Sequence, residues 1–263
     1  MQIEISPDLA LLSAGFAVDG KTLIGGVTHA FVAGEVCAVL GPNGAGKSTL
    51  LGMLGATLKP SSGTAWLNGA ELHAQPGAEL ARQRAVLLQE SSVAFDYSVA
   101  DVVGLGRYPH RLQPAKDEAQ IAQSAMHACN VDAFSDRILN TLSGGEKARA
   151  QMARVLAQIW HDLGKPRWLL LDEPTAALDM AHQQAMLDVV RKWAKLQNFG
   201  VVLVMHDLNL ALRYTDACLV LSAGAVVARG ATADVLQPPL IARVWQVDSE
   251  RSTNSRGQAC LLF

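Results

Sequence analysis

The strongest chemical signal in the sequence is a glycine-rich segment that follows a short apolar run, Val36–Leu40. The segment reads Gly41-Pro42-Asn43-Gly44-Ala45-Gly46-Lys47-Ser48-Thr49. Glycines at this spacing let backbone N–H groups curl round a β-phosphate, while Lys47 can reach the β- and γ-phosphate oxygens and Ser48 can bind Mg²⁺. A glycine-rich turn with a chance lysine is the alternative, but average residue frequencies give the four fixed positions in about 1% of chains this long. The segment therefore predicts a phosphate-binding loop.

Two adjacent carboxylates, Asp172 and Glu173, end an apolar run at residues 168–171. Asp172, at the end of the expected strand, can hold a water bound to Mg²⁺. Glu173, one residue on, points differently and can accept a proton from an attacking water. Taken alone, the pair is equally well explained by a solvated acidic turn. Downstream of a phosphate loop, we favour the catalytic interpretation.

The decisive motif is a short segment for which a generic phosphate-loop enzyme has no use, Leu142-Ser143-Gly144-Gly145-Glu146. A helix that begins at a Ser-Gly-Gly turn offers free N–H groups, a hydroxyl and the positive end of its dipole, which together suit a γ-phosphate. An ordinary capped helix start is the alternative, and Ser143 would serve that role as well. Chance gives this pentapeptide in about 0.05% of chains. Its occurrence together with the phosphate loop indicates one functional unit.

With these motifs the chain resembles ABC transporter ATPases over nearly its whole length, in the order and spacing that the family has. The resemblance adds Gln89 as the glutamine of the Q-loop, Ala177-Leu178-Asp179 as the D-loop, and His206 after the strand expected at 201–205. A lone glutamine or histidine would carry little weight. Here each stands at the family's spacing, so we expect both to be functional.

The resemblance implies a head-to-tail homodimer that encloses two ATP molecules. Each ATP would lie between the phosphate loop of one subunit and residues 143–146 of the other. Neither surface alone surrounds a γ-phosphate, so ATP would complete the interface and its hydrolysis would weaken it. The implied cofactors are ATP and Mg²⁺, and the residues implied to hold the metal are Ser48, Gln89 and Asp172.

Catalytic roles follow from the same resemblance. Glu173 would be the general base, and His206 would orient the γ-phosphate and the water. Gln89 would contact Mg²⁺ and transmit the closure of the dimer to other parts of the protein. Asp179 would help to join the two subunits.

Two positions depart from the family's pattern. The adenine-stacking aromatic of the family falls at Val18, with Phe16 nearby but out of step, so we expect an apolar contact with the base in place of a stacked one. Nucleoside selectivity stays open for this reason. Lys147-Ala148 replaces the polar pair that commonly follows the signature, and we expect little effect from that change.

Strands and helices must position these motifs. The pattern of apolar and turn-forming residues changes along the chain and predicts where these elements lie. Residues 1–88 have the pattern of strands and turns, with a tight hairpin turn at Asn68-Gly69. Residues from about 98 to 160 are mostly helical, with Ser98 and Asp101 as a capping pair and an amphipathic helix over 116–129. Beyond residue 168 the pattern alternates again. A helix is expected over 179–198, with Gly200 as its stop.

The expected fold class is α/β: a P-loop NTPase core with a mostly parallel sheet, an antiparallel β subdomain and an inserted α-helical subdomain. Half of the 263 residues are hydrophobic and 17% are charged, which allows a large core. We expect a single ABC ATPase domain over residues 1–263. Its core would lie at about 1–90 and 165–263, and its helical subdomain at about 91–164.

Charge and cysteine content limit the classes of partner, metal site and cellular compartment that we expect for this protein. A formal net charge of -2 and a pI near 6.4 argue against nucleic acid as a partner. The four cysteines form no C-x-x-C pair, which argues against a zinc site or a disulfide framework and favours a reducing cytosol. The first residues do not have the pattern of a signal peptide, and the longest apolar stretches fall short of the ~18–20 residues that span a bilayer. We therefore expect a cytoplasmic protein that is peripheral on the inner face of the bacterial cell membrane.

Within the family, residues 89–111 resemble the ATPases of bacterial importers for iron chelates, haem and vitamin B12. The connection at 159–167 resembles the hemin-import branch most closely. The resemblance implies integral-membrane permease subunits as direct partners and a periplasmic substrate-binding protein as an indirect one. Ferric-siderophore import, cobalamin import and a non-transport role such as iron–sulfur assembly stay open. A phosphate-loop kinase would leave residues 143–146 unexplained.

Apolar side chains shortly after Gln89 allow two interpretations. Val93, Phe95 and Tyr97 lie in a stretch too short and too polar to form a core element. They either pack under the helical insert or, with a helix over 99–106, line a groove for a short cytoplasmic helix of the permease.

Overall fold

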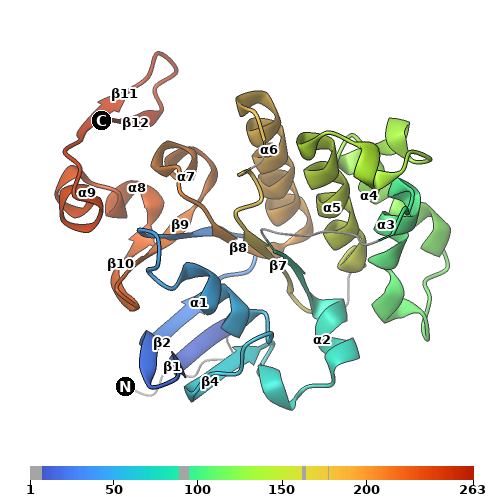
Figure 1. The fold of residues 1–263 in the computed structure, drawn as a ribbon, viewed down its shortest axis with the longest axis horizontal. Helices are drawn as coiled ribbons and strands as arrows, with labels where there is room; N and C mark the ends of the chain where they lie inside the picture. The colour runs from blue at the N-terminus through green and yellow to red at the C-terminus, as the bar shows by residue number, and fades with distance from the viewer. Residues whose placement is uncertain (1–7, 89–94, 162–163, 177) are drawn as a thin grey trace.

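The computed structural model describes residues 8–88, 95–161, 164–176 and 178–263 (Figure 1). Within these residues, the central sheet has six strands in the order β10-β9-β3-β8-β7-β6. They are β3 (Val36–Leu40), β6 (Arg84–Leu87), β7 (Arg167–Asp172), β8 (Phe199–Val204), β9 (Ala217–Ser222) and β10 (Ala225–Ala231). Neighbouring strands run parallel, except that β9 and β10 are antiparallel. The expectation of a mostly parallel sheet is confirmed.

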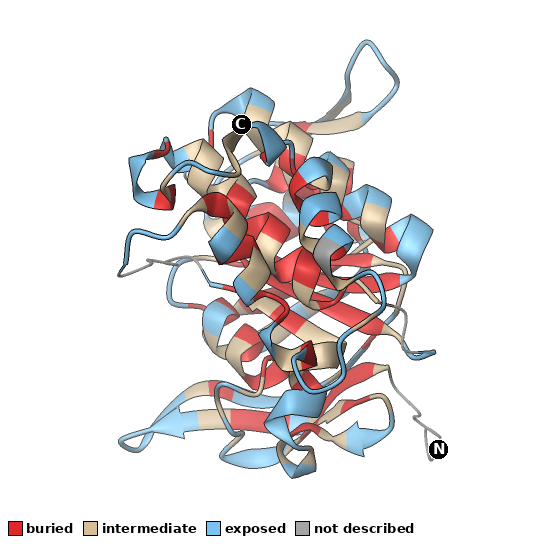
Figure 2. Cartoon of the chain, turned by 90° about the vertical axis from the view of Figure 1, so that its right-hand side faces the viewer, coloured by how far each residue is buried: buried red, intermediate tan, exposed pale blue. Residues whose placement is uncertain are grey.

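The middle strands of this sheet are covered on both faces. β3, β7 and β8 are buried along their whole length, and Figure 2 shows buried strand segments in red through the middle of the molecule. Consecutive apolar residues are typical of parallel strands in such a position. In β3, Val36, Ala38 and Leu40 face one core, while Cys37 and Val39 face the other. The sheet therefore separates two hydrophobic cores.

The core on the Cys37 side contains helix α1 (Lys47–Leu54) and an antiparallel sheet. That sheet has the order β2-β1-β4-β5 and consists of β1 (Leu9–Val18), β2 (Lys21–Phe31), β4 (Ser62–Leu67) and β5 (Ala70–Glu71). Asn68 and Gly69, with φ of 50° and 80°, form the tight turn expected between β4 and β5. Helix α1 lies between the two sheets (Figure 1), which fixes the glycine-rich loop at its start.

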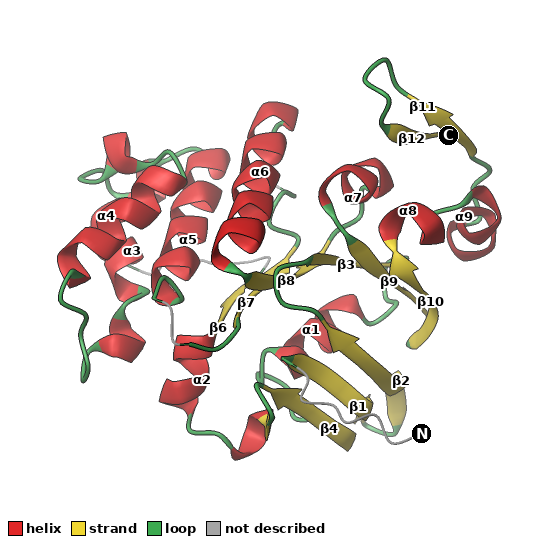
Figure 3. Ribbon diagram, turned by 180° about the vertical axis from the view of Figure 1, so that it is seen from behind, coloured by secondary structure: helices red, strands yellow, loops and turns green. Residues whose placement is uncertain are grey.

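The core on the opposite side contains α5 (Gly144–Gln158), α6 (Met180–Gln197) and α7 (Leu208–Tyr214). Helices α3 (Val99–Leu105) and α4 (Glu118–Ala128) lie with α5 beside the edge of the sheet (Figures 1 and 3). Ser98 and Asp101 form the expected capping box, and α4 falls within the helix expected over 116–129. The subdomain boundaries at about 91 and 164 stay a prediction.

Shorter elements complete the described chain. Helix α2 (Gly77–Gln83) precedes β6, and α8 (Thr232–Val235), α9 (Pro238–Trp245) and the hairpin of β11 (Glu250–Thr253) and β12 (Ala259–Leu262) follow β10. Cys37, Cys129, Cys218 and Cys260 are free thiols. Among the residues described here, no helix combines the length and the apolar character that crossing a membrane requires.

The end of α6 differs from the sequence-based expectation, and the prediction that Gly200 stops this helix was wrong. Asn198 adopts the left-handed conformation, with φ 53° and ψ 40°, and ends the helix two residues earlier. Gly200 lies inside β8, where an added Cβ would stand 2.3 Å from Cζ3 of Trp168. The glycine is therefore required by a long-range contact, which a local pattern does not reveal.

Gly200→Ala is expected to destabilise the fold by about 1–3 kcal/mol, because the ring of Trp168 is fully buried and an added methyl group overpacks the site. Gly77→Ala is the matched control, since no atom lies within 4 Å of its added Cβ. Its effect should stay within about 0.5 kcal/mol. Denaturant unfolding measures the free energy of unfolding of the two variants. Equal values would show that the Trp168 ring moves aside without cost to stability.

Candidate active site

The glycine-rich loop joins the end of β3 to the start of α1 in a conformation that requires glycine. Gly41, Gly44 and Gly46 have φ of 148°, 74° and 97°, a region that disfavours other residues. A Cβ at Gly41 would stand 2.2 Å from the carbonyl oxygen of Leu221. Gly46 is the N-cap of α1, and no side chain caps this helix. Free N–H groups and the positive end of the dipole at this turn suit an anion.

Lys47, the first residue of α1, is folded back onto this loop. Its Nζ donates to the carbonyl oxygens of Gly41 and Pro42 over 2.9 Å each. Burial lowers the pKa of Lys47, while the nearby carboxylates of Glu173 and Asp172 act in the opposite direction. The ammonium group therefore lies at the mouth of the loop, where it can exchange carbonyl partners for phosphate oxygens.

Asp172, at the end of β7, is the candidate partner of a metal ion. Its side chain is 6% exposed, it accepts a hydrogen bond from Ser48, and its Oδ1 has no hydrogen-bond partner. Burial raises the pKa of Asp172, against the effect of that hydrogen bond. The described residues contain no group of three or more acidic, histidine or cysteine side chains able to hold a metal ion by themselves. An orphaned carboxylate oxygen beside Ser48 fits Mg²⁺ that takes its other ligands from water and phosphate.

Glu173 and His206 are brought together by adjacent parallel strands. Asp172 pairs with Val204 in the register of β7 and β8, so the residues just beyond the strands meet at one edge of the sheet. Glu173 has a φ of 48°, and its Oε1 accepts a hydrogen bond from Nε2 of His206. The Glu173 side chain is mostly buried, while that of His206 is half-exposed. Through this hydrogen bond, His206 can hold the carboxylate of Glu173 in position to accept a proton.

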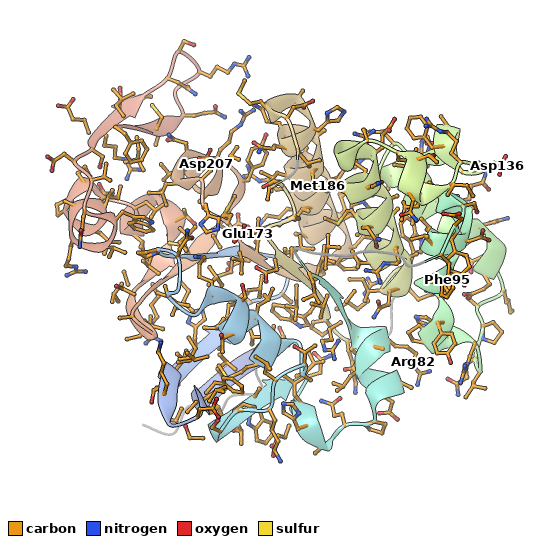
Figure 4. All side chains as sticks on the ribbon, viewed as in Figure 1. Arg82, Phe95, Asp136, Glu173, Met186 and Asp207 are labelled. Carbon is orange, nitrogen blue, oxygen red and sulfur yellow. The ribbon has the colours of Figure 1, made fainter. Side chains whose placement is uncertain are left out.

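Asp207 is a residue that the sequence analysis did not single out. Its Oδ1 accepts from the backbone N–H groups of Asn209 and Leu210 over 2.8 and 2.9 Å, which caps α7 directly after His206. Glu173, His206 and Asp207 line one small cleft of about 120 Å³, and Figure 4 labels Glu173 near the middle of the molecule with Asp207 above it. The sequence signal that could have identified Asp207 is an aspartate directly after His206 and before a helical run.

A larger hollow of about 1080 Å³, between α4 and α6, is lined by none of the predicted site residues.

The signature segment begins α5 as a capped and exposed helix start. Ser143 Oγ accepts from the N–H of Glu146 over 3.3 Å, and Oε2 of Glu146 accepts from the N–H of Ser143 over 2.8 Å. The hydrogen bond from the Ser143 backbone lowers the pKa of Glu146. Ser143 and Gly144 are exposed, so this end of the helix lies at the surface. The capping and phosphate-binding interpretations are therefore compatible.

Within one subunit the two segments predicted to bind phosphate lie on opposite faces of the sheet. Helix α1 belongs to the core on the Cys37 side and α5 to the other core, and Figure 1 shows the two helices on opposite sides of the central sheet. The structure thus brings together Lys47, Ser48 and Asp172 with the pair Glu173 and His206. It does not bring the segment at 143–146 to them.

Four further residues from the sequence analysis remain to be placed. Asp179 is exposed at the N-cap of α6, where it accepts from the N–H of His182 over 2.9 Å and from the imidazole Nδ1 over 2.8 Å. Val18 is exposed at the end of β1. Gln89 and Ala177 lie outside the described residues, so the roles predicted for them stay predictions.

Comparison with known proteins gives a consistent family. The ABC transporter family model matches residues 24–176, which is more than half of the 263 residues. A hemin import ATP-binding protein, HmuV of Burkholderia pseudomallei, is 47% identical over 244 residues, covering 87% of this chain and 89% of that protein. HmuV of Escherichia coli O157:H7 is 42% identical over 234 residues, covering 89% and 90%.

Solved structures share the fold. An ABC transporter chain in an inward-facing conformation is 25% identical, with a TM-score of 0.82, and the match covers 98% of this chain and 97% of that one. A dimeric bacterial ABC transporter cassette, MJ0796, is 23% identical with a TM-score of 0.73, covering 85% and 98%. Because the family model and the curated relatives agree over most of the sequence, this chain belongs to the ABC transporter family, as one of its ATPases.

Proposed function

We propose that two copies of this chain close over two ATP molecules and that hydrolysis drives the import of haem through a separate permease. The observation that supports it most is the pair of Glu173 and His206, which stands at the strand ends beside the uncapped start of α1. A carboxylate positioned by a second side chain next to a phosphate-binding loop is the arrangement that activates water for attack on a γ-phosphate.

Each site residue has a proposed task; the surroundings of the described residues support theirs, and the task of Gln89, outside the described residues, rests on the family resemblance. The loop at 41–49 cradles the phosphates with its backbone amides, and Lys47 leaves two carbonyl oxygens to bind the β- and γ-phosphates. Ser48, Asp172 and Gln89 would hold Mg²⁺, which would supply positive charge to offset that of the phosphate groups. Glu173 takes the proton of the attacking water on its carboxylate. His206 keeps that carboxylate in place and contacts the γ-phosphate.

A homodimer follows from the separation of the two phosphate-binding surfaces. The exposed start of α5 lies on the other face of the sheet from α1, so it is available to the ATP of a second subunit. Asp179, exposed at the start of α6, would meet the partner near that contact. A solved cassette of this fold is described as dimeric, which agrees with the proposal.

Haem is the proposed cargo because the relatives with 42–47% identity are hemin import ATP-binding proteins. The chain would act on the cytoplasmic side of the inner membrane, bound to permease subunits that receive haem from a periplasmic binding protein. The test is the ATPase rate of proteoliposomes that contain the chain and the permease encoded beside its gene. Hemin-loaded binding protein should raise the rate, whereas a rise with cobalamin or a ferric siderophore alone would assign a different cargo.

The permease should dock on apolar side chains beside α3. Phe95 is 69% exposed and Tyr97 is 40% exposed, and their rings touch edge to face with centroids 6.0 Å apart. The alternative, that they pack under the helical insert, does not agree with this exposure. Leu105, at the end of α3, is half-exposed as well. Exposed rings of this kind are typical anchors for a helix in a groove.

Phe95→Ala and Tyr97→Ala are expected to weaken permease binding about 30-fold, the effect of losing an anchor worth ~2 kcal/mol. Basal ATPase activity and thermal stability should change little, because neither ring contributes to the core. Co-purification with the permease measures the loss, with Leu196→Ala, an exposed apolar residue of α6, as the control. Unaffected co-purification together with lower thermal stability would show that the rings belong to the fold.

A further inference from the structure

A buried arginine joins the segment after α3 to the far end of the signature helix α5. Arg107 is 7% exposed and donates from Nε to Oε1 of Glu118 over 2.7 Å and from Nη2 to Oε2 over 3.1 Å. Its third nitrogen, Nη1, donates to the carbonyl oxygen of Ala157 over 2.7 Å. One guanidinium therefore connects the first residue of α4 with the last turn of α5.

Two histidines extend this contact. Nη2 of Arg107 lies 3.3 Å from Nδ1 of His161, and because a guanidinium only donates, Nδ1 is the acceptor. In the neutral ring Nε2 then carries the proton and faces Oδ1 of Asp117 at 3.3 Å. His110 donates from Nε2 to the carbonyl oxygen of Gln158 over 2.8 Å. Burial lowers the pKa of His110, which keeps this donor neutral near pH 7.

These donors add hydrogen bonds to carbonyl groups in the last turn of α5, where Ala157 also accepts from the backbone N–H of Trp160 over 3.4 Å. The charge of Arg107 matches the negative end of the helix dipole. The hydrogen bonds from Arg107 also lower the pKa of Glu118, so the pair stays ionised. Gly106 approaches α5 so closely that a Cβ there would stand 2.2 Å from the carbonyl oxygen of Arg154. Directional bonds and close packing together fix α5 at this end.

The opposite end of α5 begins at Ser143. With 15 residues the helix is about 22 Å long, so a tilt of roughly 3° about its C-terminal end moves the N-terminal end by about 1 Å. A misplacement of that size can cost about 100-fold in rate. The apolar contacts along the middle of α5 are non-directional, whereas the bidentate ion pair and the bond to Ala157 are directional.

We propose that Arg107, held by Glu118, is a positioning residue that sets the direction of α5 and thereby places Ser143 against the ATP of the opposite subunit. This inference rests on the proposed function, because it requires a site shared between two subunits. It assigns a role in hydrolysis to two side chains that lie at the other end of the helix from the reacting groups.

The test uses the full-length chain with Arg107→Met or Glu118→Gln. Equilibrium ATP binding and the KM for ATP should stay within about twofold, since Lys47 lies on the other side of the sheet. The kcat for ATP hydrolysis should fall about 10-fold or more. Arg107→Lys keeps the charge but not the bidentate geometry, so its kcat should lie between those of the wild type and Arg107→Met. Tyr108→Ala is the matched control, because this exposed neighbour contacts Arg111 rather than α5.

The possible outcomes separate the positioning role from a structural one. A wild-type kcat for Arg107→Met at a temperature where it is folded, accompanied by a lower unfolding midpoint, would overturn the proposal. Equal losses in kcat and in ATP binding would overturn it too, because they indicate general damage. If the wild-type chain does not hydrolyse ATP, the proposed function itself fails. A loss of kcat confined to the Arg107 and Glu118 variants supports the proposal.

Discussion

Glu173→Gln is expected to bind ATP as the wild type does and to hydrolyse it ~10²–10⁴-fold more slowly, which is the usual contribution of a general base. The amide keeps the size of the side chain and can still accept a hydrogen bond from His206. It cannot take the proton of the attacking water. Steady-state phosphate release measures the rate, and equilibrium nucleotide binding measures the affinity.

The same variant should accumulate as a dimer in the presence of ATP, because the step that opens the dimer is slowed. Gel filtration with and without ATP detects this change. Glu79→Gln is the control, since Glu79 is an exposed carboxylate on α2, outside the site, and its loss should leave both measurements unchanged. A hydrolysis rate for Glu173→Gln equal to that of the wild type would remove Glu173 from the role of general base.

The parts of the site that the sequence predicts best are those built from consecutive residues. The loop at 41–49, the strand before Asp172 and the capped start of α5 all lie where the motifs indicate. Local chemistry determines each of them, because the glycine conformations, the apolar strand and the capping box involve residues only a few positions apart. The contact of Glu173 with His206 required one further step, namely that β7 and β8 be neighbours.

Long-range contacts are what the sequence does not predict. Gly200 has the local pattern of a helix stop, yet a glycine is needed at this position because the ring of Trp168 leaves no room for a Cβ. Arg107 was noticed as part of a family-like segment, but its partners, Glu118 and Ala157, are 11 and 50 positions away. Only the packed fold shows that this charged residue, directly before the exposed Tyr108, is itself buried.

The shared site gives the second large effect. Lys47→Ala should abolish hydrolysis because it removes the ammonium that binds the β- and γ-phosphates. Ser143→Arg should abolish it for a different reason, since a bulky cation at the start of α5 blocks the contact with the other subunit's ATP. ATP binding measured on each protein should separate the two defects. It should be lost in Lys47→Ala and nearly intact in Ser143→Arg, because α1 and α5 lie in different cores.

Mixing the two inactive variants tests whether the site is composite. In a heterodimer, the intact phosphate loop of the Ser143→Arg subunit faces the intact Ser143 of the Lys47→Ala subunit, while the second site carries both changes. With random pairing of equal amounts, half of the dimers have one competent site, so roughly a quarter of the wild-type activity should return if the sites act independently.

Mixing either variant with Glu173→Gln provides the control. Its glutamine occupies the loop-side half of the site, so Lys47→Ala with Glu173→Gln should stay inactive, whereas Ser143→Arg with Glu173→Gln should recover. Full activity of either single variant, or no recovery in any mixture that forms heterodimers, would contradict a site shared between two subunits.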